Sequence, residues 1–232
     1  MLRLNVRIIP RISVSKPNKR TRETKIVHPT ENWFFDLDNT LYQKPDLFRL
    51  IDERINRFVM RFMGVDKEKA EIIRKDFFVK YGTTLRGLIK NFSVDPESYL
   101  DYVHDIDVKR LLKYDFSLKS ALENIKAQKF IFTNASKKHA EAVLSSLGIR
   151  GCFLDIFDTA YFGYHAKPEA YTFSKIANDF RGKNIMIDDY PKNIEAAKKS
   201  GFCTVLVGKK SSDYADIQIK DIHNISMAND LI

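Results

Sequence analysis

The stretch Trp33-Phe34-Phe35-Asp36-Leu37-Asp38-Asn39-Thr40 places a short apolar run directly before two carboxylates. A second run, Asn184-Ile185-Met186-Ile187, ends in the same way, at Asp188-Asp189. Both runs are short, rich in β-prone residues and bounded by polar ones, which predicts two buried strands. Open α/β sheets place their sites at the carboxyl ends of their strands. Four carboxylates gathered there need a cation to neutralise them, so we expect a hard divalent metal and chemistry on phosphate.

The chain that follows the first strand has a helical pattern. After Pro45 the apolar residues recur at the spacing of an α-helix, namely at Leu47, Ile51, Ile55, Phe58 and Phe62. Gly64 and Gly82 are expected to end two successive helices, and Asp66 to cap the second of them. Further short helical patterns fill residues 83–115. A helical insert, residues 45–115, is therefore expected between the first strand and the next.

The second half of the chain alternates between strand and helix patterns. Strands are expected at 130–132, 184–187 and 203–207, and helices at about 118–126, 137–147 and 192–199. Pro168 is expected to open a further helix at its first turn, where a missing N–H costs nothing. Strands that alternate with helices predict an α/β fold with a parallel sheet. We expect its core to comprise residues 31–44 and 116–232.

Length and composition limit the class of protein. The 232 residues, 44% of them apolar, suffice for one sizeable core and a small subdomain. The sequence holds no apolar stretch of the roughly 18 residues that span a membrane. Its two cysteines, Cys152 and Cys203, lie in apolar surroundings, so we expect reduced thiols in the core and a reducing compartment.

The net charge of +9 is concentrated in residues 1–30, which hold eight basic residues and one acidic residue. The remaining chain is nearly neutral, so nothing in its composition indicates nucleic-acid binding by the core. The basic segment has three interpretations. It is a dispensable or mis-assigned start, an organelle transit peptide, or an arm that binds RNA or a membrane surface. In each case we expect a flexible N-terminal arm.

Four short motifs could carry the chemistry, and each has an ordinary structural alternative. Asp36 and Asp38 suit a nucleophile and a proton carrier, or two capping aspartates. Thr133 and Asn134, at a strand end, suit the binding of phosphate oxygens, or a plain turn. Lys167 could hold Asp36 ionised and neutralise phosphoryl charge, or it could be a solvated surface lysine.

The fourth motif is the acid pair Asp188-Asp189, which suits Mg²⁺ coordination or an acidic helix cap. The four motifs occur in this order, and each ends a strand or opens a helix. In this respect residues 31–208 resemble the haloacid dehalogenase (HAD) superfamily of phosphohydrolases. The resemblance implies a Rossmann-like parallel sheet with an inserted α-helical cap.

The resemblance also implies a role for each motif. Asp36 matches the nucleophile and a Mg²⁺ ligand, and Asp38 matches the general acid/base, with its backbone carbonyl on the metal. Thr133 matches the phosphate-binding hydroxyl, with Asn134 beside it. The charge-stabilising lysine is matched by Lys167. The acids that complete the metal site match Asp188 and Asp189, either of which could be the direct ligand. Because Asp38 is present, the resemblance implies a phosphatase rather than a dehalogenase.

A narrower resemblance is to the pyrimidine 5′-nucleotidase branch of this superfamily. It rests on the segments 35–42, 81–88, 131–135, 139–140 and 147–149, with Tyr102-Val103-His104 before 112–115. Tyr164-His165-Ala166 and Tyr190-Pro191 depart from that pattern. The cap loop is expected to select the substrate through Tyr81, Thr83, Thr84 and Arg86, with Arg86 as a second anion contact. A solvated helix end is the alternative for this loop.

The sequence therefore predicts a Mg²⁺-dependent phosphatase that acts on pyrimidine nucleoside 5′-monophosphates. A capped phosphatase for a sugar phosphate or phosphoglycolate is the enzymatic alternative. An RNA-associated protein that uses the basic arm is the alternative from another class. The expected partner is a small phosphorylated substrate, a nucleotide, with no membrane and no nucleic acid for the core. We expect a cytoplasmic protein, or an organelle protein targeted through residues 1–30. The oligomeric state stays open.

Overall fold

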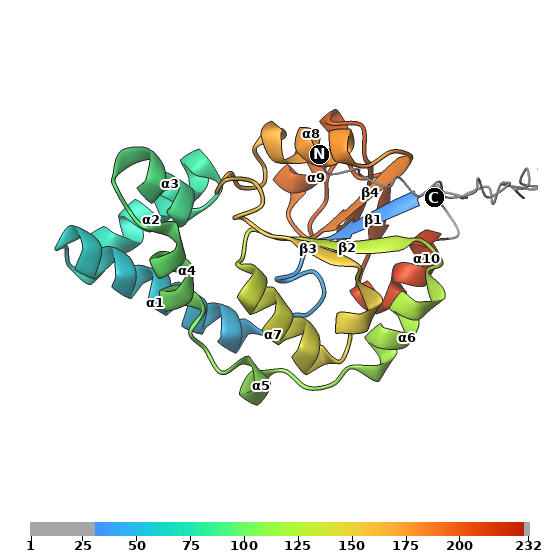
Figure 1. Cartoon of the computed structure of the whole chain (residues 1–232), viewed down its shortest axis with the longest axis horizontal. Coiled ribbons are helices and arrows are strands. Elements are labelled where there is room, and N and C mark those ends of the chain that lie inside the picture. The colour runs from blue at the N-terminus through green and yellow to red at the C-terminus, as the bar shows by residue number, and fades with distance from the viewer. Residues whose placement is uncertain (1–30, 230–232) are drawn as a thin grey trace, which may run out of the picture.

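The computed structural model describes residues 31–229, which form a parallel sheet with helices on both faces (Figure 1). The strands are β1 (Glu31–Phe35), β2 (Gln128–Phe132), β3 (Asp155–Phe157), β4 (Lys183–Asp188), β5 (Cys203–Val207) and β6 (Ile217–Ile219). The six strands run in the order β3-β2-β1-β4-β5-β6, and every neighbouring pair is parallel. This confirms the predicted α/β class. Because β1 lies between β2 and β4, the residues that follow it emerge at the middle of the sheet.

The helices largely begin and end at the predicted signals. Those between β1 and β2 are α1 (Pro45–Met63), α2 (Lys67–Tyr81), α3 (Thr84–Asn91), α4 (Pro96–His104), α5 (Val108–Leu111) and α6 (Phe116–Asn124). Those after β2 are α7 (Lys137–Leu147), α8 (Ala170–Asp179), α9 (Pro191–Lys199) and α10 (Ile225–Asn229). Asp66 caps α2 by accepting a hydrogen bond from the Lys69 N–H at 2.8 Å. Gly64 and Gly82 end α1 and α2 with φ of 65° and 82°, which glycine adopts without strain.

Alternating side chains of the sheet make two cores. Trp33 and Phe35 of β1 face α6, α7 and α10, in one cluster with Ile131 and Ile187. Phe34, between them, faces the opposite layer of α8 and α9, where it stacks on the ring of Phe130 at 5.3 Å. The sheet is therefore buried on both faces, as the continuous apolar runs predict.

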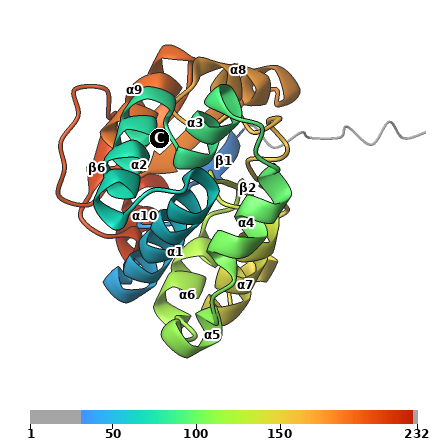
Figure 2. The ribbon, with the colours of Figure 1, turned by 90° about the vertical axis from the view of Figure 1, so that its left-hand side faces the viewer.

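The helices α1–α4 stand to one side of the sheet and enclose a third apolar cluster (Figures 1 and 2). The cluster is centred on Val59, Leu88 and Val103. The first turn of α1, with Leu47, and the short α5, with Val108, instead pack into the core of the sheet. That residues 45–115 form a single cap domain stays a prediction. By their packing, the two ends of this segment belong to the core of the sheet.

Three expectations differ from the structure. The strands β3 and β6 were not predicted, because each is only three residues long and too short to show a period. Pro168 does not open α8, which begins two residues later at Ala170. Cys152 and Cys203 are free thiols, but they are half-buried at the margin of the core rather than inside it.

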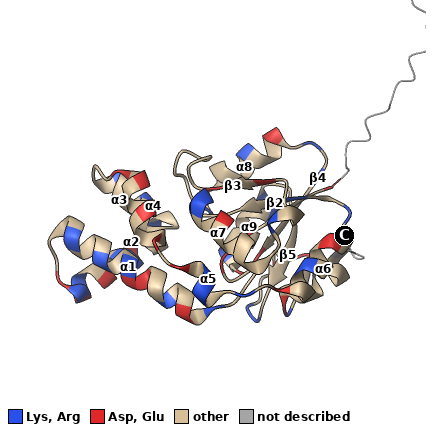
Figure 3. Ribbon diagram, turned by 60° about the horizontal axis from the view of Figure 1, so that its bottom comes forward, with Lys and Arg blue, Asp and Glu red and all other residues tan. Residues whose placement is uncertain are grey.

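Acidic and basic residues are interspersed along the described helices, including α1 and α2 (Figure 3). This distribution agrees with the near-neutral charge of the sequence after residue 30. Within residues 31–229, no helix is both long and apolar enough to cross a bilayer. The expectations for the basic arm concern residues 1–30, which lie outside the described residues.

Candidate active site

The predicted site residues come together where the central strands end. Asp36 directly follows β1, Thr133 directly follows β2, and Asp188 is the last residue of β4. The parallel pairing continues past β1, since the N–H of Asp36 donates to the carbonyl of Ile187 at 2.8 Å. The two acid clusters, about 150 residues apart in the chain, thus meet because their strands are neighbours.

Lys167 is the buried centre of this site. Its Nζ donates to Asp36 Oδ1 at 2.8 Å, to Asp188 Oδ2 at 2.8 Å and to the Phe132 carbonyl at 2.7 Å. The side chain is 1% exposed, and all three ammonium donors have acceptors. The surface-lysine alternative is therefore excluded. Burial would lower the pKa of Lys167, but the charges of Asp188 and Asp36 outweigh it and raise the pKa.

Asp36 is held on both of its oxygens. Oδ1 accepts from Lys167, and Oδ2 accepts from the Thr40 hydroxyl at 3.0 Å. Burial, opposed by Lys167 and reinforced by the negative charge of Asp188, raises the pKa of Asp36 to about 8. The pKa of Asp36 and the pKa of Lys167 can both be raised, because Lys167 contacts two carboxylates. One carboxylate is enough to balance the charge of the ammonium, so Asp36 can be protonated while Lys167 stays charged.

Three carboxylates form a group that could hold a cation. One oxygen each from Asp36, Asp188 and Asp189 lies within 4.8 Å of the others. Asn193 of α9 orients Asp188 by donating to its Oδ1 at 3.1 Å and to its Oδ2 at 2.9 Å. Burial and the neighbouring Asp188 raise the pKa of Asp189. Crowded acids with raised pKa values are stabilised by a hard divalent ion with oxygen ligands, so this set fits Mg²⁺.

The Asp38 side chain lies outside this carboxylate group, so the expectation of four clustered carboxylates is wrong in this respect. Its Oδ1 accepts from the Tyr42 hydroxyl and from His139 Nε2, the latter at 3.4 Å. Burial alone would raise the pKa of Asp38, but these two hydrogen bonds outweigh it and lower the pKa. Among the described residues, no hydrogen bond involves Oδ2, which is left for a reacting group. A metal role for Asp38 through its backbone carbonyl stays a prediction.

Thr133 and Asn134 both line the pocket that holds Asp36, Asp38 and Asp188, which we call the catalytic pocket. The two side chains have different roles there. Thr133 Oγ1 accepts from the Ala135 N–H at 3.0 Å, which leaves its hydroxyl hydrogen for a phosphate oxygen. Asn134 forms a reciprocal pair with the backbone of Lys167, accepting from its N–H at 2.8 Å and donating to its carbonyl at 3.0 Å. The Asn134 amide thus positions the loop that carries Lys167. The sequence predicted a substrate contact for Asn134 and did not predict this role.

A cavity of about 550 Å³ inside the helical insert adjoins the catalytic pocket of about 500 Å³. Phe78, His104 and Asn134 line both spaces, which are therefore direct neighbours. Thr83 and Thr84 lie on the cavity wall, as expected for groups that meet a leaving group. We call this space the cap cavity.

The structure corrects the expected role of Arg86. Its guanidinium bonds to Glu169 through Nε at 2.9 Å and also contacts His165, and the side chain is 7% exposed. A charge that is already paired and buried is a poor second contact for a substrate anion. Tyr81 lies with Arg86 in another pocket, of about 420 Å³, and neither residue lines the cap cavity. Both residues face the loop that carries Lys167.

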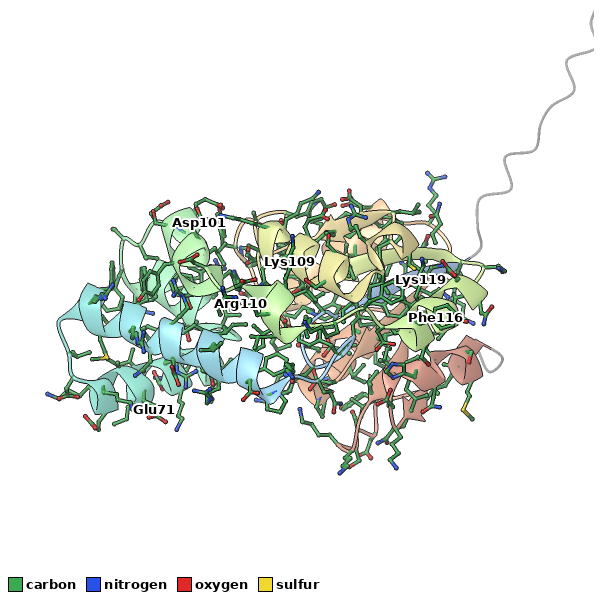
Figure 4. The ribbon with its side chains drawn as sticks, turned by 90° about the horizontal axis from the view of Figure 1, so that it is seen from below. Glu71, Asp101, Lys109, Arg110, Phe116 and Lys119 are labelled. Carbon is green, nitrogen blue, oxygen red and sulfur yellow. The ribbon has the colours of Figure 1, made fainter. Side chains whose placement is uncertain are left out.

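The two departures from the family pattern in the sequence are contacts between the insert and the core. Tyr164 donates to Glu97, and Tyr190 lies with its ring 6.0 Å from that of Phe78. A further link is the ion pair of Lys138 with Asp101, at 2.8 Å; Figure 4 labels Asp101 on α4. These contacts hold the insert over the ends of the strands, and they involve residues whose partners are distant in sequence.

Sequence reasoning missed four side chains of the site. They are Thr40, Asn193, His139 and Tyr42, which orient Asp36, Asp188 and Asp38. Thr40 also accepts from the Asp189 N–H at 3.0 Å, so it links the two acid clusters. In the sequence, Thr40 follows Asp38 by two residues and Asp36 by four, and this spacing was the available signal for its role. His139 is 101 residues from Asp38 in the chain, and no local pattern indicates that contact.

A family model for hydrolases, described as haloacid dehalogenase-like hydrolase, matches residues 33–201. The match includes every catalytic and metal-site residue described above. This chain belongs to the haloacid dehalogenase-like hydrolases. The predicted membership is thereby confirmed, whereas the pyrimidine nucleotidase branch remains a resemblance.

Relatives agree with this HAD-like assignment. The chain is 32% identical over 146 residues to phosphate metabolism protein 8 of Saccharomyces cerevisiae, covering 59% of this chain and 44% of that protein. It thus spans less than half of the length of this curated relative.

Solved structures share the fold. A HAD-hydrolase from Bacillus subtilis, YfnB, bound to magnesium, has a TM-score of 0.58 at 16% identity over 87% of this chain and 99% of its own. A HAD phosphatase from Thermococcus onnurineus has a TM-score of 0.57 at 16% identity, over 85% of this chain and 97% of its own. At such identities the likeness establishes the fold of this HAD-like hydrolase and nothing about its substrate.

We expect Mg²⁺ to bind this HAD-like hydrolase more tightly as the pH rises towards 8. The pKa of Asp36 is about 8 in the metal-free protein, so below that pH a proton must leave before the cation binds. The apparent affinity should rise by up to about tenfold per pH unit and then level off. Calorimetric titration at pH 6.5, 7.5 and 8.5 measures it. The Asp36→Asn variant should lose the pH dependence, and equal wild-type affinities at all three pH values would contradict the site.

Proposed function

We propose that this HAD-like hydrolase is a Mg²⁺-dependent phosphomonoesterase that acts on pyrimidine nucleoside 5′-monophosphates through an aspartyl-phosphate. The observation that carries the proposal is the position of the cap cavity directly beside the catalytic pocket, with three lining residues in common. A phosphate bound beside Asp36 and Thr133 would direct its leaving group past Phe78 into that cavity. The volume of about 550 Å³ suits a nucleoside more than a two-carbon acid.

In the first step, a carboxylate oxygen of Asp36 attacks the phosphorus, and the bond from phosphorus to the ester oxygen breaks. Asp38, whose pKa is lowered in the free protein, takes up a proton as the substrate phosphate binds, and the departing oxygen takes that proton and leaves as an alcohol. Asp38 suits this task because Tyr42 and His139 hold Oδ1 and leave Oδ2 unbonded among the described residues. The hydroxyl of Thr133 donates to a phosphoryl oxygen and keeps the group in line.

In the second step, water attacks the phosphorus of the aspartyl-phosphate and gives its proton to Asp38, which is now a carboxylate. The bond between phosphorus and the Asp36 oxygen breaks, so the nucleophile is restored and inorganic phosphate leaves. Lys167 keeps its hydrogen bond to Asp36 Oδ1 and balances negative charge throughout. A Mg²⁺ ion held by Asp36, Asp188 and Asp189 would, when bound, draw charge from the phosphoryl oxygens.

The lining of the cap cavity supports a nucleoside over the alternatives. Its walls are mainly apolar, with Ile55, Leu85, Leu100 and Val103 among them. Phosphoglycolate would place a carboxylate between these walls, where the two basic side chains, Lys75 and Arg74, are already paired with Glu71 and Asp52. A sugar phosphate would leave more of the apolar wall uncovered than a nucleoside does. A flat heterocycle with few polar atoms matches such walls better.

We expect UMP and CMP to be hydrolysed with a higher kcat/KM than ribose 5-phosphate, by roughly tenfold or more. The ring adds apolar contact in the cap cavity, worth on the order of 25 cal/mol per Å² of buried surface. Phosphate release from a panel of UMP, CMP, AMP, GMP, ribose 5-phosphate and phosphoglycolate tests the proposal. A sugar phosphate that exceeds every nucleotide tenfold would refute the nucleotidase assignment, while leaving a HAD phosphatase.

A further inference from the structure

The cap cavity has one polar end that the catalytic residues do not use. Most of its wall is apolar, but Tyr99, Arg74 and Asp52 lie together on it. They come from three helices, α4, α2 and α1, so their meeting is a product of how the insert packs. Asp52 is exposed, whereas Tyr99 is buried and Arg74 mostly buried, and a buried polar group in an apolar wall is costly unless something satisfies it.

Of the three residues, Tyr99 most clearly indicates a contact with a ligand. The residue is 3% exposed, and its ring packs edge-on against Phe58 at 4.9 Å. Within residues 31–229, no hydrogen bond to its hydroxyl is found, although buried tyrosine hydroxyls usually have a partner. Burial raises the pKa of Tyr99 well above its ordinary value despite the nearby Arg74. The hydroxyl therefore keeps its proton and remains a donor.

Arg74 lies beside it on the same cavity wall, and its guanidinium is the second donor group there. Its Nη1 pairs with Asp52, which fixes the guanidinium between α1 and α2. Its Nε is enclosed and has no hydrogen-bond partner among the described residues. The electrostatic influence of both Arg74 and Asp52 reaches Tyr99, so the groups are close. The end of the cavity thus offers donors and a positive charge, which favour a neutral oxygen acceptor.

We infer that Tyr99 and Arg74 are specificity-determining residues that bind a ring carbonyl oxygen of the leaving group at the far end of the cap cavity. The inference rests on the proposed nucleotidase function and names its subsite. Uracil and cytosine both present a carbonyl oxygen, whereas adenine presents none. The donors would therefore favour UMP and CMP over AMP, and ribose 5-phosphate, which has no ring carbonyl, would be indifferent to them.

The test compares wild type with Tyr99→Phe, which removes one oxygen and keeps the ring. We expect kcat/KM for UMP to fall about tenfold, which is the upper end for one neutral hydrogen bond, mainly through KM. Ribose 5-phosphate should change by less than about twofold, because it does not reach this end. Arg74→Lys, which keeps the charge beside Asp52 but removes Nε, should also lower the ratio of UMP to AMP.

Tyr102→Phe is the matched control, since Tyr102 lies on the same helix but packs against Arg54 and Arg61, away from the cap cavity. It should leave the UMP to AMP ratio unchanged. If wild type prefers UMP and CMP but Tyr99→Phe and Arg74→Lys keep that preference, the inference fails while the proposed function stands. If wild type prefers a sugar phosphate, both fail. Hexyl phosphate, which fills the apolar walls without hydrogen bonds, should lag behind UMP, and a faster reaction would overturn the inference.

Discussion

Replacing Asp36 with asparagine should abolish turnover, by a factor on the order of 10⁴ or more, while the protein stays folded. An amide is not a nucleophile towards phosphorus, and it is a poorer metal ligand than a carboxylate. The fold should not suffer, because the carboxylate is itself poorly accommodated. Its pKa of about 8 means that above this pH the protein holds a buried charge that burial and Asp188 disfavour.

The Asp36→Asn variant should therefore lose activity without losing stability. The raised pKa makes the wild-type contribution favourable below the unfolded pKa and lost as the pH rises through about 8. At pH 9 the variant should unfold at the same or a higher urea concentration than wild type. Phosphate release from p-nitrophenyl phosphate and urea unfolding measure the two properties. Activity within tenfold of wild type would eliminate Asp36 as the nucleophile.

Asp38→Asn is the informative comparison for the same assay. It keeps the nucleophile but removes the proton carrier, so turnover should fall by on the order of 10²–10⁴. The loss should be larger for a nucleotide than for p-nitrophenyl phosphate, whose leaving group needs little protonation. Asp36→Asn should show no such dependence on the leaving group.

Replacing Lys167 with methionine should damage activity and stability together. The ammonium bridges Asp36 and Asp188 at 2.8 Å each, and the side chain is 1% exposed. Without it, two buried carboxylates face each other, and the pKa of Asp36 must rise further because its lowering influence is gone. Turnover should fall on the order of 10³-fold, and removal of one partner from a buried pair should cost about 3–5 kcal/mol of stability.

The stability loss in Lys167→Met should grow with pH. Lys167 has a raised pKa, so its contribution to wild type is fully present at neutral pH and is lost only as the pH rises through that value. In the variant, the unpaired carboxylates are relieved by protonation, so the deficit should be smaller at pH 5 than at pH 8. Urea unfolding at both pH values measures it. Lys175→Met, which removes a half-buried lysine paired with Asp179 outside the site, is the control and should change neither property. A pH-independent deficit would contradict the charge balance described for this site.

Much of the fold could be predicted because its signals are local. The strands β1, β2, β4 and β5 each span five or six residues and hold three consecutive apolar ones, which is enough to show a strand between turn residues. The short β3 and β6 could not be predicted, because three residues carry no period. They are recognised only by their pairing with neighbouring strands, which is a contact between distant segments.

The residues of the cap show what local sequence signals cannot predict. Thr83, Thr84 and Arg86 are adjacent in sequence, yet the threonines line the cap cavity while Arg86 pairs with Glu169, 83 positions away. The direction of each side chain follows from how α3 packs, which residue spacing does not specify. Tyr99 gave no sequence signal for the same reason, since its neighbours in the cavity come from other helices.

By itself, the sequence determined the class of fold, the family and the residues that would handle phosphate, because the motifs of Asp36, Thr133 and Asp188 sit at the ends of recognisable strands and Lys167 lies shortly before a helix. The tertiary structure decided what holds those residues, from Thr40 on Asp36 to His139 on Asp38, and which part of the insert faces the leaving group. Strand-end motifs are set by local periodicity and by the rule that parallel strands end at one edge. Orientation and pairing across the cap are set by packing between distant segments, which exists only once the chain has folded.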